Sequence, residues 1–383
     1  MPILSRRALL GGLVATPLWA VAAADRGAVF DAIWRRIARD YWDPELNRVD
    51  WAAAAARFRP QALAAPDETG FYRIVNRMLA LIGDSHVYAQ SPAARSYDEQ
   101  REDGGETAGF GIATAESADG WRIFAVRPGG PAARAGVEIG WVLLAVGSRP
   151  PDTDWHPMPG EAVILALRDD DGRTRSVRVT AEPLATDPPR ATRLLAGGIL
   201  LLRLDAFDDG DARWIGREIE AAAPRAVILD LRENGGGGAI EGARVAGRFF
   251  AEKRTLLRRI ERRRSLDVPI LSAGRRAWTG PLALLVGPRS ASAAEALAAL
   301  VGEAGRGPVV GERTAGALTG AVRIDLPDGG LLSIAEADVR TPGGKRIEGV
   351  GVVPTDPITP ALADLRAGRD PVLARAQMLL SAG

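Results

Sequence analysis

The sequence predicts a multi-domain α/β protein with a helical N-terminal segment, a β-rich middle segment and an α/β core in its C-terminal half. Apolar residues first recur at helical spacing and then give way to short strands. After the pair Pro188-Pro189, strand and helix alternate. Two strands joined by a crossover helix indicate a parallel sheet, because parallel strands need such a long connection.

Length and composition exclude several kinds of chemistry. The chain has 383 residues, of which 46% are hydrophobic and 25% charged, and its net charge of +1 gives no footprint for nucleic acid. It holds no cysteine, so disulfides, thiolate catalysis and cysteine-bound metals are excluded. Histidine occurs only at His86 and His156, which rules out a histidine-rich metal site. We therefore expect no metal and no cofactor.

Residues 1–24 have the features of an export signal. Arg6 and Arg7 precede an apolar run that ends in Ala22–Ala24 and is too short and too broken by Pro and Gly for a transmembrane helix. The paired arginines are similar to those of twin-arginine signals. We expect cleavage near Ala24 and a periplasmic or secreted protein, with membrane association only if the segment stays uncleaved.

Residues 25–100 are expected to form a helical domain. Apolar residues within Phe30–Tyr41 and Phe71–Ile82 recur at helical spacing. Gly83 ends the second run and leaves Asp84–His86 in the connection that follows. A lone histidine after a helix is more often structural, but here two polar neighbours could hold its ring.

Residues 105–185 are predicted to be a β domain, after an aperiodic stretch from Ser91 to Glu106 that we expect to be a linker or loop. This segment resembles a PDZ domain. Its Gly-Phe-Gly-Ile stretch looks like the carboxylate-binding loop of that fold, and its PAARAGV stretch looks like the following helix turn.

The PDZ resemblance implies that an extended peptide adds to the edge of a sheet and that its chain end is held by backbone N–H groups. The residues that would hold it are Gly109, Phe110, Gly111 and Ile112. A purely structural β domain that binds nothing stays open as the alternative.

The third segment, residues 190–383, contains a glycine-rich connection between a strand and a helix, Gly235–Gly238. Four glycines let the backbone approach a ligand and expose its N–H groups, as donation to an oxyanion requires. A phosphate or dinucleotide loop is the competing interpretation, but both the GxGxxG pattern and the lysine-bearing phosphate loop are absent. A merely tight turn remains the plain alternative.

A second strand, Leu284–Val286, runs through a turn with serines into an Ala- and Leu-rich helix that opens near Glu295. A serine in this turn lies at the N-terminal end of a helix, where unpaired N–H groups and the helix dipole favour the negative charge of an acyl-transfer oxyanion. Ordinary helix capping by serine is the alternative interpretation.

Four motifs after the PDZ-like segment, DLRENGGG, SASAAE, VGERTAG and IEGVGVVPTDP, resemble those of the C-terminal processing, or tail-specific, serine peptidases. The resemblance covers essentially the whole mature chain. It implies an α/β catalytic core of the ClpP/crotonase type, with Ser292 as nucleophile. The oxyanion donors would be the N–H groups of Ala293 and of either Gly236 or Gly237.

The lysine that serves as general base in that family is missing, because its position holds Ala317. The GDSHVY segment is similar instead to the tricorn-core branch, where a Ser-His pair from this region and a late glutamate complete the site. This resemblance implies that His86 is the base and that Ser85 and Glu348 orient it. An imidazole with a pKa of about 6.5 can activate a serine at neutral pH.

The expected function is therefore that of a secreted serine peptidase that cleaves protein or peptide substrates near their C-termini. Because the family lysine is absent, two alternatives stay open. One is a catalytically silent protein that binds peptides or apolar ligands on the same fold, as interphotoreceptor retinoid-binding protein does. The other is a hydrolase of small esters. The expected partners are protein or peptide substrates, and the oligomeric state is not predicted.

Overall fold

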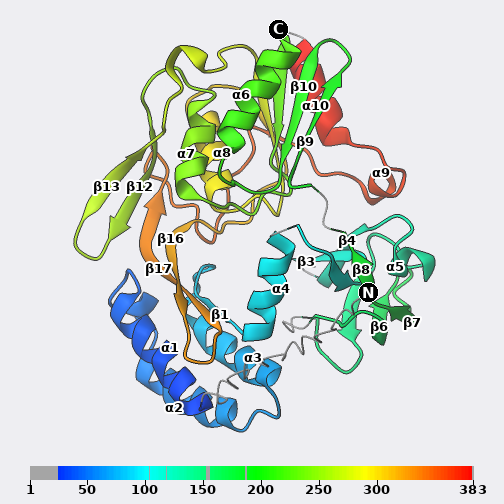
Figure 1. Ribbon diagram of the computed structural model, residues 1–383, viewed down its shortest axis with the longest axis vertical. Coiled ribbons are helices and arrows are strands. Elements are labelled where there is room, and N and C mark those ends of the chain that lie inside the picture. The colour runs from blue at the N-terminus through cyan, green and yellow to red at the C-terminus, as the bar shows by residue number, and fades with distance from the viewer. Residues whose placement is uncertain (1–24, 103, 118, 152–155, 186–187, 382–383) are drawn as a thin grey trace, which may run out of the picture.

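The structure, a computed structural model, describes residues 25–381 except residues 103, 118, 152–155 and 186–187. Figure 1 shows a mixed α/β fold, with an α/β core above, a helical segment below and a β domain at one side. The export signal expected at residues 1–24 lies outside the described residues. Within the described part of the chain, no helix is both long enough and apolar enough to cross a membrane.

The N-terminal segment is helical. Aspartate side chains cap its helices by accepting hydrogen bonds from backbone N–H groups two or three residues ahead. The apolar faces of the helices meet in one buried cluster. The elements are α1 (Arg26–Asp40), η1 (Leu46–Arg48), α2 (Trp51–Leu63), α3 (Glu68–Leu79) and η2 (Ala80–Ile82).

The helical segment shares its hydrophobic core with a hairpin from the last quarter of the chain. The hairpin consists of β16 (Thr319–Asp325) and β17 (Leu331–Arg340), and Leu332 and Ile334 of β17 are fully buried among the helices. The short strand β1 (Tyr88–Gln90) pairs antiparallel with β17. The connection that carries His86 is therefore fixed between the first helices and the late hairpin.

The prediction of a linker or loop between Ser91 and Glu106 is wrong for most of this stretch, because α4 (Pro92–Glu102) occupies it. The Ser91 hydroxyl accepts a hydrogen bond from Ala94 N at 3.2 Å, and proline at the first helical position suits a helix start. Arg95 and Glu99 form an ion pair one turn apart. Most of the side chains of α4 are polar, so the sequence shows no apolar periodicity that would predict this helix.

The middle segment is a five-stranded antiparallel sheet in the order β3-β4-β5-β6-β7, with β2 and β8 paired beside it. Its buried side chains form a cluster of their own. The elements are β2 (Thr107–Gly109), β3 (Ile112–Ser117), β4 (Gly120–Val126), α5 (Pro131–Arg134), β5 (Val142–Val146), β6 (Ala162–Arg168), β7 (Thr174–Thr180) and β8 (Glu182–Leu184).

The C-terminal half is built on a six-stranded sheet in the order β18-β15-β14-β11-β10-β9, parallel except for β9. The crossover helices α6, α7 and α8 cover one face, and α10 packs on the other (Figure 1). The elements are β9 (Arg190–Leu195), β10 (Ile199–Leu204), α6 (Asp211–Ala222), β11 (Ala226–Asp230), α7 (Ala239–Gly247), β14 (Leu282–Val286), α8 (Ala293–Glu303), β15 (Val309–Gly311), β18 (Asp356–Pro357), α9 (Leu362–Arg366) and α10 (Pro371–Ser381).

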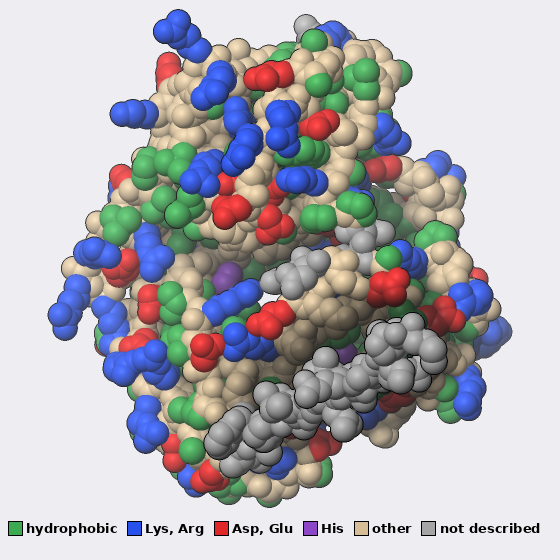
Figure 2. All heavy atoms as spheres, viewed as in Figure 1, with side chains coloured by type: hydrophobic (Ala, Val, Ile, Leu, Met, Phe, Trp, Pro, Cys, Tyr) green, Lys and Arg blue, Asp and Glu red, His purple; other side chains and the backbone are tan. Residues whose placement is uncertain are grey.

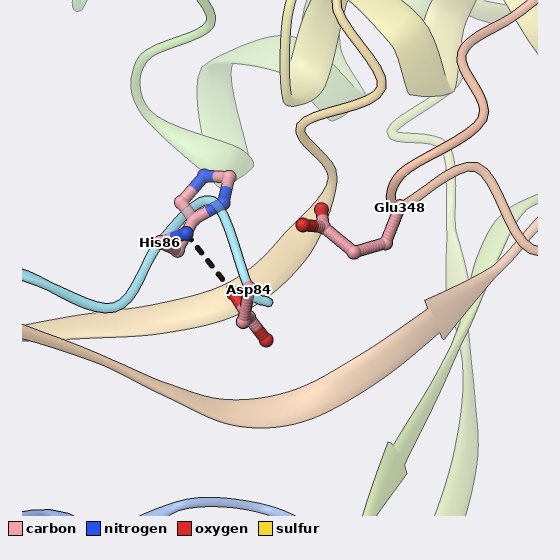
Figure 3. A group of neighbouring side chains, drawn as sticks. All are labelled: Asp84, His86 and Glu348. Atoms are coloured by element: carbon pink, nitrogen blue, oxygen red, sulfur yellow. Dashed lines mark hydrogen bonds between the residues drawn. The ribbon is translucent and has the colours of Figure 1, made fainter. Parts of the chain in front are cut away.

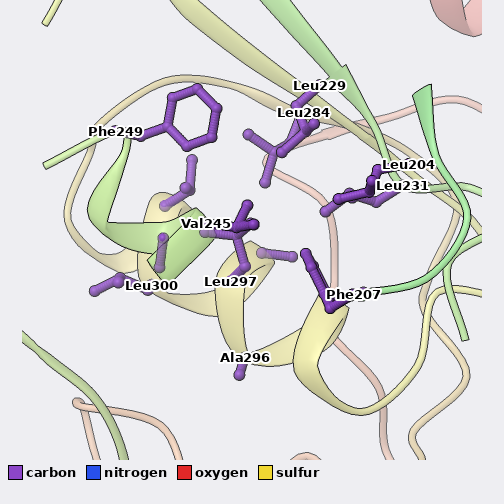
Figure 4. Packing of buried hydrophobic residues seen from close by; sticks show 14 of the residues in the cluster. Leu204, Phe207, Leu229, Leu231, Val245, Phe249, Leu284, Ala296, Leu297 and Leu300 are labelled. Atoms are coloured by element: carbon purple, nitrogen blue, oxygen red, sulfur yellow. The ribbon is translucent and has the colours of Figure 1, made fainter. Parts of the chain in front are cut away.

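The main core lies between this sheet and its helices. Figure 4 shows Leu229 and Leu284 of the sheet close to Val245 of α7 and Leu297 of α8. All four side chains are fully buried. Because helices cover both faces of this sheet, the central strands consist almost entirely of apolar residues, as is typical of a parallel sheet.

One hairpin that the sequence analysis did not predict lies between α7 and β14. Strands β12 (Thr255–Glu261) and β13 (Ser265–Pro269) form a hairpin, and the 3-10 turn η3 (Gly274–Arg276) follows it. Arginines interrupt the apolar alternation of β12, which hides the strand from a pattern search.

Candidate active site

Ser292 lies between β14 and α8 in a backbone conformation that few residues other than glycine adopt. Its φ is 52° and its ψ is −119°. Its N–H donates to Ala317 O at 2.8 Å and to Glu295 Oε2 at 3.1 Å. A backbone of this kind costs about 1–3 kcal/mol and persists where surrounding structure enforces it, often at reactive residues on strand-to-helix turns.

Glu295, which the sequence analysis left without a role, enforces that conformation. Its carboxylate is fully buried and accepts hydrogen bonds from four groups. Besides Ser292 N, the donors are Thr314 Oγ1 at 2.5 Å, Gly316 N at 2.7 Å and Ala317 N at 2.8 Å. Burial raises the pKa of this carboxyl, and the four donors oppose that shift. A glutamate at the third position of a helix is the available sequence signal, since it marks a capping box.

The glycine-rich connection lies against Ser292. A Cβ placed on Gly236, whose φ is 109°, would lie 2.6 Å from Ser292 Cβ. Gly236 is buried, and its N–H donates to Asn234 Oδ1 at 2.9 Å. Gly237 is exposed, and among the described residues neither its N–H nor that of Ala293 has a hydrogen-bond acceptor.

His86 belongs to a relay that runs to Glu348. Ser85 Oγ lies 2.9 Å from His86 Nδ1 and donates to Glu348 Oε2 at 3.0 Å. A hydroxyl carries one proton, so Ser85 Oγ must accept from Nδ1–H while it donates to the carboxylate. The proton of the neutral imidazole therefore lies on Nδ1, which leaves the lone pair on Nε2.

Ser292 and the relay are hydrogen-bonded to two consecutive residues, Ala317 and Leu318. Ala317 O accepts from Ser292 N, and the next residue, Leu318, donates its N–H to Glu348 Oε2 at 2.8 Å. Glu348 Oε1 also accepts from Ser85 N at 2.8 Å. The structure thus brings together elements that lie about two hundred residues apart in the chain.

Asp84 is a second residue that the predicted site omitted. Its buried carboxylate accepts from His86 N at 3.0 Å and Tyr41 Oη at 3.1 Å, and Thr319 Oγ1 lies 3.5 Å away. Burial raises the pKa of Asp84, and burial also lowers the pKa of the His86 imidazole. Glu348 and Asp84 oppose the shift at His86, whereas the positive charge of Arg323 adds to it.

Asp84, His86 and Glu348 offer ligand atoms that all lie within 4.8 Å of one another, as a metal site would require (Figure 3). Both oxygens of Glu348 already accept hydrogen bonds from N–H or O–H donors, and so do those of Asp84. A bound cation would have to displace these donors. The geometry therefore suits a hydrogen-bond relay better than a metal centre.

The four residues predicted to hold a peptide end lie in the β domain, away from this cluster. Gly109 ends β2, Phe110 is buried in the domain core, and Gly111 has a φ of 74°. Ile112 opens β3, which is an edge strand of its sheet.

The second histidine serves a different purpose. The ring of His156 stacks on that of Tyr97 from α4, with 3.7 Å between the centroids. This contact fastens the loop before β6 to α4.

Two protein-family models match parts of this chain. Residues 198–358 match peptidase family S41, and residues 22–80 match the tricorn protease C1 domain. The chain is 28% identical to the chloroplastic carboxyl-terminal-processing peptidase 2 of Arabidopsis thaliana, over 89% of this chain and 70% of that protein. It is 26% identical to a carboxyl-terminal-processing protease of Picosynechococcus, over 88% of this chain and 84% of that protein.

Two further similarities extend the match. The solved structure of a photosystem II D1 C-terminal processing protease superposes with a TM-score of 0.64 at 22% identity, over 87% of this chain and 93% of that one. Tricorn protease homolog 1 of Streptomyces coelicolor is 27% identical over 92% of this chain but only 34% of its own length.

The fold and these matches define a serine-type peptidase, a hydrolase that acts on protein substrates. More particularly, the chain belongs to the C-terminal processing peptidase family. The family assignment made from the four motifs is thereby confirmed.

Proposed function

We propose that this protein is an exported peptidase that cleaves protein or peptide substrates near their C-termini, with Ser292 as nucleophile and His86 as general base. The observation that carries the proposal is the relay from His86 Nδ1 through Ser85 Oγ to Glu348, with hydrogen bonds of 2.9 and 3.0 Å. It supplies the tautomer and the negative charge that a base acting on serine needs, in a chain whose family lysine position holds alanine.

In the proposed mechanism, His86 Nε2 takes the proton of Ser292 Oγ as the oxygen attacks the scissile carbonyl carbon. The imidazolium that forms is stabilised through Nδ1–H, the Ser85 hydroxyl and the Glu348 carboxylate. His86 then gives its proton to the leaving amine. A water molecule, deprotonated by the same nitrogen, hydrolyses the acyl-enzyme.

The oxyanion would be held by the N–H groups of Gly237 and Ala293. Gly236, the other candidate, has its N–H engaged by the Asn234 side chain, while its buried position keeps the loop against Ser292. Gly237 is the exposed neighbour in the same loop. Removing one oxyanion donor typically costs about 10²–10³ in kcat.

The finer domain assignments belong to the same proposal. The β domain would act as a PDZ-like module that adds a substrate peptide to β3, because β3 lies at the edge of its sheet and begins at Ile112, the last residue of the GFGI stretch. The parallel sheet with its crossover helices supports a crotonase-like core. The basic and apolar N-terminal sequence supports export.

The test combines casein hydrolysis with labelling by a fluorophosphonate serine probe. We expect both in the wild-type protein, neither in Ser292→Ala, and a loss of casein turnover by about three to six orders of magnitude in His86→Ala. His156→Phe is the matched control, since phenylalanine can keep the stack on Tyr97, and it should retain activity. Full activity in His86→Ala would contradict the proposed base. A wild-type protein that is not labelled would favour the silent binding protein instead.

A further inference from the structure

The strand that leaves the relay carries a positive charge close to the proposed base. Leu318 bonds Glu348, and Thr319, the first residue of β16, lies beside Asp84. Arg323 follows on the same strand, after a register shift between Gly320 and Ala321, and its side chain is on the same face as that of Asp325, because side chains alternate along a strand.

The strand register places Arg323 next to the segment that holds His86. Ser333 of β17 is opposite Tyr88 of β1 on one side and opposite Arg323 of β16 on the other. The three residues form one row, about 10 Å wide at typical strand spacing. His86 lies two residues before Tyr88, within reach of a long side chain from the other end of the row. Figure 2 shows a histidine side chain with basic side chains beside it, in the hollow between the two halves of the molecule.

Arg323 is exposed and, within the part of the chain that the structure describes, forms no ion pair and donates no side-chain hydrogen bond. The next acidic residue on that face, Asp325, is already paired with Arg95 at 2.7 Å. The positive charge of Arg323 disfavours the protonated form of His86 and so lowers its pKa, less strongly than burial does, whereas Glu348 and Asp84 favour that form. During catalysis an imidazolium must form there, so an unneutralised Arg323 opposes the reaction.

We propose that Arg323 binds a carboxylate of the substrate, and so couples recognition of that carboxylate to the basicity of His86. The inference rests on the proposed function, since it assumes that His86 acts as the base. A bound carboxylate would neutralise Arg323, remove the penalty on the imidazolium and fix the substrate at a set distance from Ser292. An arginine suits this task because its planar fork can pair with both carboxylate oxygens.

The carboxylate could come from the substrate's C-terminus or from an acidic side chain. The experiment therefore uses four versions of one internally quenched peptide, with a free or amidated C-terminus and with glutamate or glutamine near that end. We expect the wild-type protein to prefer one carboxylate-bearing version about tenfold or more in kcat/KM, as for one charge-assisted pair. Which substitution removes the preference identifies the source.

In Arg323→Gln the preference should fall to about one, and Arg323→Lys should keep part of it. Arg193→Gln, which removes an exposed arginine from β9, is the matched control and should keep the full preference. With the amidated glutamine peptide, the acid limb of kcat/KM should move to higher pH in Arg323→Gln, because a charge that lowers the pKa of His86 is gone. A merely structural role of Arg323 would change neither the ratio nor the limb.

The same four peptides are also titrated against Ser292→Ala protein with and without Arg323→Gln, so that binding is read without turnover. A preference in binding that Arg323→Gln removes supports the inference even if hydrolysis is slow. Equal binding and equal cleavage of all four peptides by proteins with arginine at position 323 would overturn it. That result would leave the proposed function intact, whereas a wild-type protein without probe labelling or cleavage would count against the function itself.

Discussion

Replacing Glu348 by glutamine tests the direction of the relay. Glu348 accepts three hydrogen bonds, from Ser85 N, Ser85 Oγ and Leu318 N, so both of its carboxylate oxygens act as acceptors. A glutamine amide must point its NH₂ group at one side of this set, so at least one donor faces another donor. If the NH₂ lies at the Oε2 position, Ser85 Oγ accepts from it and turns its own proton toward His86 Nδ1.

That reversal would select the wrong tautomer of His86, with its proton on Nε2 and no lone pair for Ser292. With the opposite amide orientation the tautomer survives, but the Ser85 N–H loses its acceptor and the imidazolium loses its carboxylate. The comparable aspartate-to-asparagine change in the triad of another serine protease lowers kcat about 10⁴-fold. We expect a fall of about 10²–10⁴ for Glu348→Gln. Ser85→Ala, which removes one hydrogen bond to the ring, should cost about 10–100-fold.

The assay is steady-state cleavage of a quenched peptide across pH, with folding checked by circular dichroism. Glu336→Gln is the matched control, because this carboxylate lies on β17 and only approaches Arg259 at 4.0 Å. Since Glu348 raises the pKa of His86, its loss should also move the acid limb to lower pH. Wild-type kcat in Glu348→Gln, or a fall no larger than that in Ser85→Ala, would refute the relay.

Three other outcomes are expected. Burial lowers the pKa of His86, so the acid limb of kcat/KM should lie below about pH 6.5, and a midpoint above that value would show that the base is not this imidazole. Gly236→Ala should lose most of its activity, since its Cβ would lie 2.6 Å from Ser292 Cβ, whereas Gly344→Ala, with a φ of 82° and nothing within 4 Å of its Cβ, should keep it. Glu295→Ala should lower the free energy of unfolding in urea by about 3–5 kcal/mol, because four donors lose their acceptor. The control Glu220→Ala, at an exposed position of α6, should cost about 1 kcal/mol or less.

Local patterns predicted the local parts of this fold well. The strand, turn and helix around Ser292 follow from an apolar run, small residues and a helical repeat, and the structure places β14 and α8 there. The stretch at Ser91–Glu106 was misread because α4 is held by polar caps and ion pairs. The β12–β13 hairpin was missed because arginines interrupt β12 and fill the turn that follows it.

The residues of the candidate site lie far apart in the sequence. Ser85 and Glu348 are 263 positions apart, and no spacing rule links them, so only family resemblance could nominate both. Their roles stay predictions, to which the structure adds a relay with a defined tautomer. The sequence analysis did not identify Glu295 and Asp84 as site residues. Both side chains accept hydrogen bonds from backbone N–H groups, and the only sequence signal of that role is a carboxylate near a helix start or a turn.

The core shared by α1–α3 and β17 ties the position of the proposed base to the packing of distant parts of the chain. His86 is positioned only when a hairpin made about 240 residues after it has packed against the first helices, whereas the turn around Ser292 needs neighbours closer in the chain. A partly made or partly unfolded molecule would hold a serine without its base. If His86 is the base, peptidase activity would appear only when folding is complete, so incompletely folded molecules would not cleave one another.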